Sequence, residues 1–276
     1  MKIPPFIIGA TLFAVGTDLP EIANSIISSA SGHGDLNIGD SVGSTLVQAT
    51  LVLGLLPLIV GPFRVKGRIG VIGAMTVAML AVGAFLASDG ALSRRDAALL
   101  LSGWFGGSLV AWRYAPAIAE PVMPVPARRR SYNAFAALTA LALVGAGAAL
   151  AVAAFIQIAK ELSVSEYVIS FFVASIGTSL PELVVDVTAL RRSERDLAVG
   201  DVMGSSFVDA TLSVGIGPLL FPTAVTASQA VRGGLFTAAA IAIVVVVLTR
   251  VARHDWRTGL LLIGLYAASY VVVLAL

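Results

Sequence analysis

Long apolar stretches separated by short polar and charged segments make up the chain. A helix that crosses a bilayer needs about 20 mostly apolar residues, and nine stretches of this kind can be delimited. Their connections are short except for residues 116–132, which contain proline and arginine. The pattern predicts an all-α membrane protein, a polytopic bundle of about nine transmembrane helices. The predicted spans are 4–30, 38–60, 69–88, 97–115, 133–159, 166–190, 198–220, 230–249 and 258–275.

The basic residues predict the orientation of these spans. If nine helices alternate in direction, 14 of the 18 Lys and Arg residues lie on one side of the membrane. Cytoplasmic connections carry an excess of Lys and Arg. We therefore predict a multi-pass protein of the plasma or inner membrane, with a cytoplasmic N-terminus and the C-terminus outside. The basic residues on the other side are Arg94, Arg95, Lys160 and Arg232.

The chain contains one motif pattern twice. An offset of 161 places Gly16–Glu21 (GTDLPE) on Gly177–Glu182 (GTSLPE). The same offset, without a gap, places Gly39–Ser44 (GDSVGS) on Gly200–Ser205 (GDVMGS). Across residues 16–54, 16 of the 39 aligned positions are identical. Shared hydrophobicity would not keep Gly, Pro, Asp and Glu in register, so we infer an internal duplication.

The two copies are predicted to be inverted, because five spans separate equivalent elements and an odd number reverses the direction across the membrane. Inverted repeats are typical of secondary transporters, whose site lies at the repeat interface near the bilayer midplane. The first half is 1–115, with its repeat at about 4–60. A cytoplasmic linker at 116–132 precedes the second half, 133–276, with its repeat at about 166–220.

Each copy places a proline, a hydroxyl and a carboxyl in the middle of an apolar span. Proline interrupts the hydrogen bonding of a helix, and a broken helix at membrane depth is tolerated only within protein or beside water. Freed carbonyls, the hydroxyls of Thr17 and Thr178 and the carboxyls of Glu21 and Glu182 are ligands typical of a hard cation such as Ca²⁺ or Na⁺.

The second helix of each repeat is expected to complete this site. Ser44 and Gln48 are four residues apart and share a helix face, as do Ser205 and Asp209. A carboxylate at the centre of a membrane helix costs about 2.5–3.5 kcal/mol, and no Lys or Arg is predicted at that depth. Cations or protons must therefore balance the acidic side chains.

The remaining acids receive structural interpretations. Asp40 and Asp201 are predicted to cap helices at the membrane surface. Asp186 is predicted to form a salt bridge with Arg191 or Arg192 near a span end. Asp18 is left open, because it could bind a cation, hold a proton or cap the second half of the broken helix.

Composition excludes several other functions. Hydrophobic residues make up 58% of the chain and charged residues 12%, and the mean hydropathy is +0.94. The net charge of +2 is too small to suggest a nucleic-acid partner. There is no Cys, and the only histidines, His33 and His254, lie in predicted polar connections. Nothing resembles a phosphate-binding loop or a nucleophile elbow. We expect no enzymatic activity and no cofactor; the expected partners are inorganic cations and the lipid bilayer.

At the duplicated motifs the sequence resembles the sodium/calcium exchangers of the Ca²⁺/cation antiporter superfamily, whose inverted repeats carry G-T-S-L-P-E and G-[ND]-x-x-G-S motifs. The sequence departs from this pattern at Asp18, where the motif has Ser, and at Gln48, where the family commonly has Asn. The resemblance implies a sodium/calcium exchanger-like fold of ten helices, of which this chain lacks the first, a gating helix. The resemblance and the two departures together give a predicted cation site of Thr17, Asp18, Glu21, Ser44, Gln48, Thr178, Ser179, Glu182, Ser205 and Asp209.

The function implied by this resemblance is secondary active antiport of cations. Exchange of Ca²⁺ for Na⁺ by alternating access at a midplane carboxylate site is expected. Proton-coupled exchange, of Ca²⁺ for H⁺ or of Na⁺ for H⁺, is one alternative. A transport-incompetent fragment or subunit without the first gating helix is another.

Overall fold

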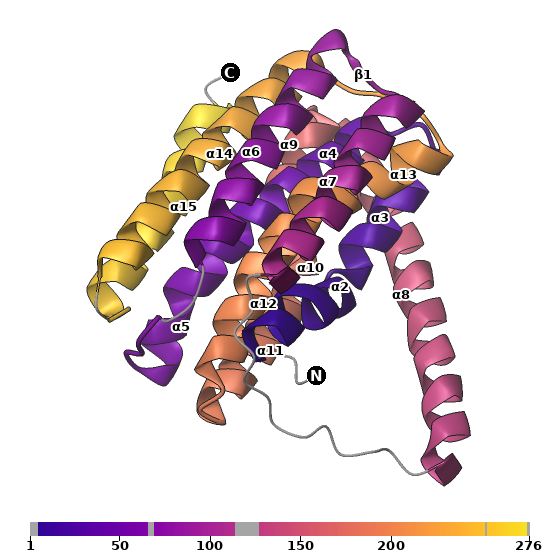
Figure 1. The fold of residues 1–276 in the computed structure, drawn as a ribbon. Coiled ribbons are helices and arrows are strands. Elements are labelled where there is room, and N and C mark those ends of the chain that lie inside the picture. Colours follow the sequence, from indigo (N-terminus) through magenta and orange to yellow (C-terminus); the bar gives the residue numbers. More distant parts are fainter. Residues whose placement is uncertain (1–4, 66–68, 114–126, 252, 275–276) are drawn as a thin grey trace.

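Helices account for nearly all of the described chain, because a backbone surrounded by lipid must satisfy its polar groups internally. The computed structural model describes residues 5–65, 69–113, 127–251 and 253–274 (Figure 1). The first half contains α1 (Pro5–Ile8), η1 (Gly9–Phe13), α2 (Ala14–Thr17), α3 (Leu19–Ala30), α4 (Gly34–Leu46), η2 (Val47–Val52), α5 (Leu53–Val60), α6 (Ile69–Leu86), η3 (Ala87–Asp89), β1 (Ala91–Leu92) and α7 (Arg94–Arg113). The second half contains α8 (Ala127–Leu162), α9 (Glu166–Ile169), η4 (Ser170–Ala174), α10 (Ser175–Thr178), α11 (Leu180–Arg191), α12 (Arg195–Val208), η5 (Asp209–Ser213), α13 (Val214–Leu220), β2 (Thr223–Ala224), α14 (Ala227–Arg250) and α15 (Trp256–Leu274).

The predicted all-α membrane bundle is confirmed, although the count of nine spans is loose. In the described part of the chain, seven helices are long and apolar enough to cross a membrane. An eighth span results if Phe6–Thr17 and Leu19–Ala30, which meet at an angle of 45°, are counted as one. The predicted span 97–115 corresponds to α7, whose 20 residues carry charges at both ends; α7 is not among those helices.

The duplication reappears in the backbone. Every element from α1 to α5 recurs 161 residues later, and no boundary differs by more than one residue. Even the π-helices recur, since η1 corresponds to η4 and η2 to η5. In Figure 1 the turn between α3 and α4 lies at the end of the molecule that carries β1, whereas the turn between α11 and α12 lies at the opposite end. The repeats are therefore inverted.

Each repeat packs its second helix against the first helix of the other repeat. Helix α4 contacts η4, and α12 contacts η1. Glycine permits both approaches: a Cβ on Gly39 would lie 2.7 Å from the carbonyl oxygen of Tyr167, and one on Gly200 would overlap the carbonyl oxygen of Phe6. The pairs are related by the same offset of 161. The two repeats thus share one core instead of forming separate bundles.

The connections gather at two opposite ends of the bundle. At one end β1 pairs antiparallel with β2, with Ala91 opposite Ala224. At the other end Phe63 and His254 exchange backbone hydrogen bonds of 3.0 and 2.8 Å. Arg64, Arg250 and Arg253 therefore share one end, as the alternation of spans requires.

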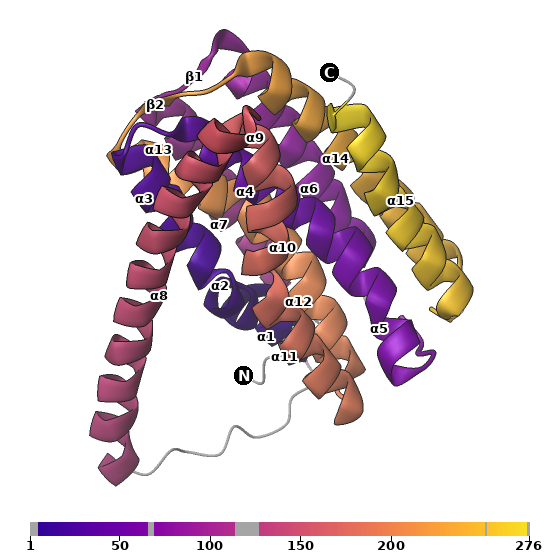
Figure 2. The ribbon, with the colours of Figure 1, turned by 180° about the vertical axis from the view of Figure 1, so that it is seen from behind.

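Helix α8 is the longest element and stands at one side of the bundle (Figure 2). It contacts α3 and α9, and its buried residues include Ala148, Val152 and Ala159. The predicted linker lies largely outside the described residues, but its residues 127–132 belong to this helix. Three basic residues used in the orientation argument, Lys2, Lys66 and Arg68, also lie outside the described residues.

Candidate functional site

Both GT-x-LPE motifs interrupt their helices at the same place. The break falls at Asp18 between α2 and α3, where ψ is 9°, and at Ser179 between α10 and α11, where ψ is 5°. The proline that follows each break occupies the first turn of the new helix, where its missing N–H costs nothing. The glutamate comes next in sequence, so each break directs a carboxyl into the interior.

Three carboxyls from the two repeats meet at these breaks. Asp18, Glu21 and Asp209 each offer one oxygen, and these oxygens all lie within 4.8 Å of one another. Glu182 lies within electrostatic reach of Asp18 and Glu21. We call these four acids the central cluster, and none of them is exposed to solvent.

The acids of the central cluster lack the partners that buried carboxyls need. Both oxygens of Glu21, Glu182 and Asp209 have no hydrogen-bond partner in the described part of the protein. One oxygen of Asp18 is also unpartnered, and the other is 3.5 Å from Nε2 of Gln48. Two like charges about 4 Å apart repel by about 4 kcal/mol even at an effective dielectric constant of about 20. Protons or bound cations must therefore neutralise the cluster.

Hydroxyl groups flank the carboxyls in two symmetric pairs. Oγ1 of Thr17 lies 3.3 Å from Oγ of Ser205, and Oγ1 of Thr178 lies 3.2 Å from Oγ of Ser44. The offset of 161 converts one pair into the other. Each pair joins a broken helix of one repeat to the second helix of the other, at the interface where cation ligands were expected.

Two further residues of the predicted cation site, Gln48 and Ser179, differ from their equivalents in the other repeat. Gln48 is fully buried, and its Oε1 has no partner. Ser179, the equivalent of Asp18, is 1% exposed, and its hydroxyl is likewise unpartnered. Both side chains thus have a free acceptor oxygen to offer an ion.

Asp40 does not cap a helix at the surface, so that prediction is wrong. It is fully buried in α4, which begins at Gly34. Nδ2 of Asn24 donates to its Oδ2 at 2.6 Å, and the hydroxyl of Thr178 donates to its Oδ1 at 3.2 Å. The sequence did hold a sign that Asp40 is more than a cap, because the aligned position of the other repeat is also an aspartate, Asp201. It held no such sign for Asn24, which aligns with Val185.

The interpretations of Asp201 and Asp186 are also wrong. Asp201 is fully buried within α12, which begins at Arg195. Asp186 is fully buried too, and no basic side chain pairs with it among the described residues, so the predicted salt bridge is absent. The two acids instead interact with each other. The sequence argument failed because it placed the helix ends too close to these residues.

Neither histidine is simply solvated in a loop. His33 pairs with Glu166, with 2.8 Å between Nδ1 and Oε2. His254 is fully buried, and its Nε2 lies 2.9 Å from the carbonyl oxygen of Leu53. Burial lowers the pKa of His254 from its ordinary 6.5.

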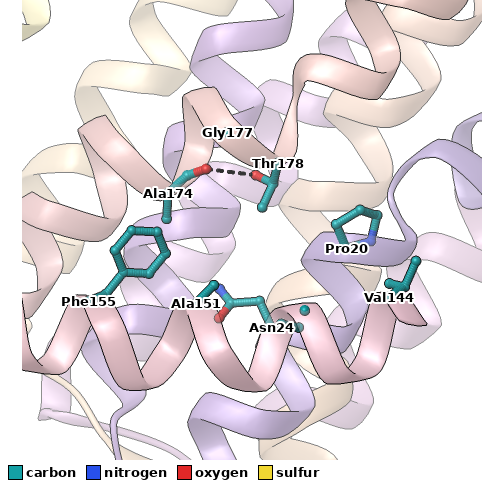
Figure 3. Close-up of a pocket in the computed structure, with 10 residues that line it drawn as sticks. Pro20, Asn24, Val144, Ala151, Phe155, Ala174, Gly177 and Thr178 are labelled. Atoms are coloured by element: carbon teal, nitrogen blue, oxygen red, sulfur yellow. Dashed lines mark hydrogen bonds between the residues drawn. The ribbon is translucent and has the colours of Figure 1, made fainter. Parts of the chain in front are cut away.

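A cavity of about 330 Å³ lies between part of α8 and the broken helices (Figure 3). One wall is a face of α8 that includes Val144, Ala151 and Phe155. The opposite wall includes Asn24 and Thr178, the two residues that donate to Asp40. The cavity therefore reaches the polar network beside the central cluster.

The family model described as "Sodium/calcium exchanger protein" matches residues 1–113 and 132–275. The chain belongs to the sodium/calcium exchanger family. Membership confirms the resemblance seen in the duplicated motifs and makes the chain a member of a family of membrane transporters.

Relatives of this exchanger family member include proteins of bacteria and archaea. The chain is 31% identical to inner membrane protein YrbG of Escherichia coli (strain K12), over 80% of this chain and 71% of that protein. It is 25% identical to sodium/calcium exchanger MaX1 of Methanosarcina acetivorans, over 99% of this chain and 90% of that protein. A solved structure of the sodium-calcium exchanger NCX_Mj, soaked with Na⁺ and Sr²⁺, superimposes with a TM-score of 0.68 at 26% identity and covers 97% of this chain and 86% of that chain.

Proposed function

We propose that this exchanger family member moves Ca²⁺ against Na⁺, and that the central cluster binds both ions in turn. The observation that supports this most strongly is the meeting of buried, unpartnered carboxyls from both repeats, three of them within 4.8 Å. Carboxylate and hydroxyl oxygens are the ligands that Ca²⁺ and Na⁺ prefer.

Charge balance explains how such a cluster couples two ions. The acids of the central cluster cannot stay ionised in the bilayer interior without positive charge beside them. An ion can then leave only when another replaces it. Competition of Ca²⁺ and Na⁺ for the same oxygens is therefore a direct route to antiport. The hydroxyl pairs Thr17–Ser205 and Ser44–Thr178 supply neutral oxygens suited to the monovalent ion.

Access to the cluster is proposed to alternate between the two ends of the molecule. The inverted repeats give the two approaches the same backbone architecture, and inverted-repeat transporters expose a fixed midplane site to each side in turn. The cavity beneath α8 supplies one approach, because it ends at Asn24 and Thr178 beside the cluster. Gly147 and Ala148 line the cavity without large side chains, so this face of α8 is smooth, which favours sliding of the helix over α3.

The test is Ca²⁺ uptake by vesicles that contain the purified full chain. Vesicles loaded with Na⁺ and diluted into Na⁺-free medium with ⁴⁵Ca²⁺ are expected to accumulate the isotope. Glu182→Gln, which keeps the side-chain shape and removes the charge, is expected to lower the initial rate at least tenfold. Glu161→Gln, at an exposed position of α8, is the matched control and should transport normally. Equal uptake by Glu182→Gln and the control would show that the site is misassigned.

Proton coupling is the second candidate, and Asp18 is the observation that favours it. This acid replaces the serine of the other repeat and belongs to the triad of close carboxyl oxygens. A further carboxyl gives the cluster one more place to hold a proton. Replacing the Na⁺ gradient by a pH gradient in the same vesicles separates the two: uptake driven only by the pH gradient identifies H⁺ as the coupling ion.

A further inference from the structure

The hairpin formed by α11 and α12 holds two buried acids that the central cluster does not include. Asp186 lies four residues after Glu182 on α11, and Asp201 lies four residues before Ser205 on α12. Four residues are one helical turn, or roughly 6 Å along the axis. The two helices contact each other and are joined by a short turn. Asp186 therefore lies about one turn from Glu182, whereas Asp201 lies about two turns from Asp209, and both acids are on the side of the α11–α12 turn.

This acid pair is buried, and no donor from outside the pair reaches it. The side chains of Asp186 and Asp201 are 0% exposed, and all four carboxyl oxygens lack a hydrogen-bond partner among the described residues. The two carboxyls lie within hydrogen-bonding reach of each other, and both interact electrostatically with Glu182. Leaving a buried polar group unpaired is destabilising, and the cost is larger for a charged group. Either a shared proton or a bound cation would therefore neutralise the pair.

The first repeat shows how the same position is satisfied without an ion. Asp40, the equivalent of Asp201, accepts hydrogen bonds from Asn24 and Thr178. Ser25, the equivalent of Asp186, accepts a hydrogen bond of 3.0 Å from the backbone N–H of Gly217. The first repeat thus has one acid with two donors, whereas the second repeat has two acids that reach only each other. The acid pair is a specific feature of the α11–α12 hairpin.

We propose that Asp186 and Asp201 form a second binding site for a divalent cation such as Ca²⁺, between the central cluster and the α11–α12 turn. One divalent ion balances two carboxylates completely. Two bidentate carboxylates supply up to about four of the 6–8 oxygens that Ca²⁺ takes, so the ion keeps part of its water. The protein ligands of this site are Asp186 and Asp201 alone, so the site does not require that the central cluster transport Ca²⁺.

The site also gives the two ends of the exchanger different properties. An ion that leaves the central cluster toward the α11–α12 turn meets the acid pair at once. An ion that leaves toward the α3–α4 turn meets Asp40, whose oxygens are already occupied by donors. The acid pair therefore raises the local concentration of divalent cation on one side only.

Equilibrium dialysis of the purified full chain against ⁴⁵Ca²⁺ in Na⁺-free detergent solution tests this site. The number of Ca²⁺ ions bound per chain at saturation is the readout. Asp186→Asn and Asp186→Ser, the latter introducing the residue of the first repeat, are each expected to bind one Ca²⁺ fewer than the wild type. Glu194→Gln, at an exposed acid of the α11–α12 turn, is the matched control and should bind the wild-type number.

The outcomes separate this site from the central cluster. If the Asp186 variants bind as many ions as the wild type, the pair shares a proton and the second site is refuted. If Glu182→Gln keeps the wild-type number while Asp186→Asn loses one ion, the central assignment fails and the second site stands. Size-exclusion elution checks that each variant is folded, and Asp201→Asn repeats the test from the other helix if an Asp186 variant is not.

Discussion

Single substitutions between the repeats decide where the negative charge lies. The first repeat has Asp18 and Gln48, whereas the second has Ser179 and Asp209 at the equivalent positions. Each repeat therefore contributes one glutamate and one further acid, but from different helices. The central cluster is symmetric in charge and asymmetric in shape, so the two ends of the site present different oxygens to an ion.

His254 shows how a buried titratable residue affects stability. Its Nδ1 lies 2.7 Å from the hydroxyl of Thr258, its Nε2 lies 2.9 Å from the carbonyl oxygen of Leu53, and its ring packs edge-on against Phe63. These contacts join the α14–α15 connection to the start of α5. Desolvation favours the neutral ring and lowers its pKa.

The lowered pKa of His254 predicts a loss of stability in acid. Above the ordinary pKa of 6.5 the ring is neutral in both states, so the contribution of His254 is complete. Below it the unfolded chain takes up a proton that the folded chain resists, and the free energy of unfolding falls. The thermal midpoint in detergent should drop between pH 7 and pH 5, and His254→Gln should flatten this dependence. An unchanged pH profile in that variant, with His33→Gln as control, would assign the effect to other groups.

At the scale of elements, close helix packing depends on particular glycines. A Cβ on Gly43 would lie 2.9 Å from both the Cα of Phe171 and the Cβ of Ser175, and it would overlap a backbone oxygen. Backbone cannot move aside as a flexible side chain can. The same approach recurs at Gly204 against Ala10, so the interlocking of the repeats rests on two equivalent contacts.

Gly43→Ala is therefore expected to destabilise the protein by about 1–3 kcal/mol, the usual cost of overpacking. Gly145→Ala in α8 is the matched control, because nothing lies within 4 Å of a Cβ added there. There the replacement should be neutral or stabilising by roughly 0.5–1 kcal/mol. Thermal midpoints of the two variants in one detergent provide the comparison. A Gly43→Ala variant as stable as the control would show that α4 can shift away from η4.

At the scale of the whole molecule, orientation in the membrane follows from which connections share an end. The Phe63–His254 bridge lies where α5 has ended and α15 is about to begin, and these helix ends are opposite the end that carries β1 and β2 (Figure 2). Arg64, Arg250 and Arg253 belong to the first end. The excess of basic residues there predicts that this end is cytoplasmic.

The absence of cysteine from the sequence makes this orientation easy to test. Cysteine is introduced at one exposed position of each end, as Arg253→Cys or Asp89→Cys. A membrane-impermeant maleimide applied to intact cells is expected to label Asp89→Cys and to leave Arg253→Cys unlabelled until the membrane is permeabilised. The reverse labelling pattern would show that the end with Arg253 faces the outside and would contradict the predicted orientation.

Much of the architecture was predictable from local sequence. Apolar stretches and charge clusters gave the helical membrane bundle, and the gap-free offset of 161 gave the duplication with boundaries that agree within one residue. The signal was strong because a bilayer permits few solutions to backbone hydrogen bonding. The span at α7 was harder to judge, because its charged ends lie within the helix.

The sequence by itself determined the family, the repeats and the residues of the two motifs, because each of these is a property of neighbouring positions. Only the tertiary structure decided which acids meet. Asp40 and Asp201 looked like surface caps until α4 and α12 proved to begin a turn or more earlier. Asp186 had basic neighbours in sequence but a buried acid beside it in space. Burial and charge balance depend on all surrounding helices at once, so no local pattern could reveal them.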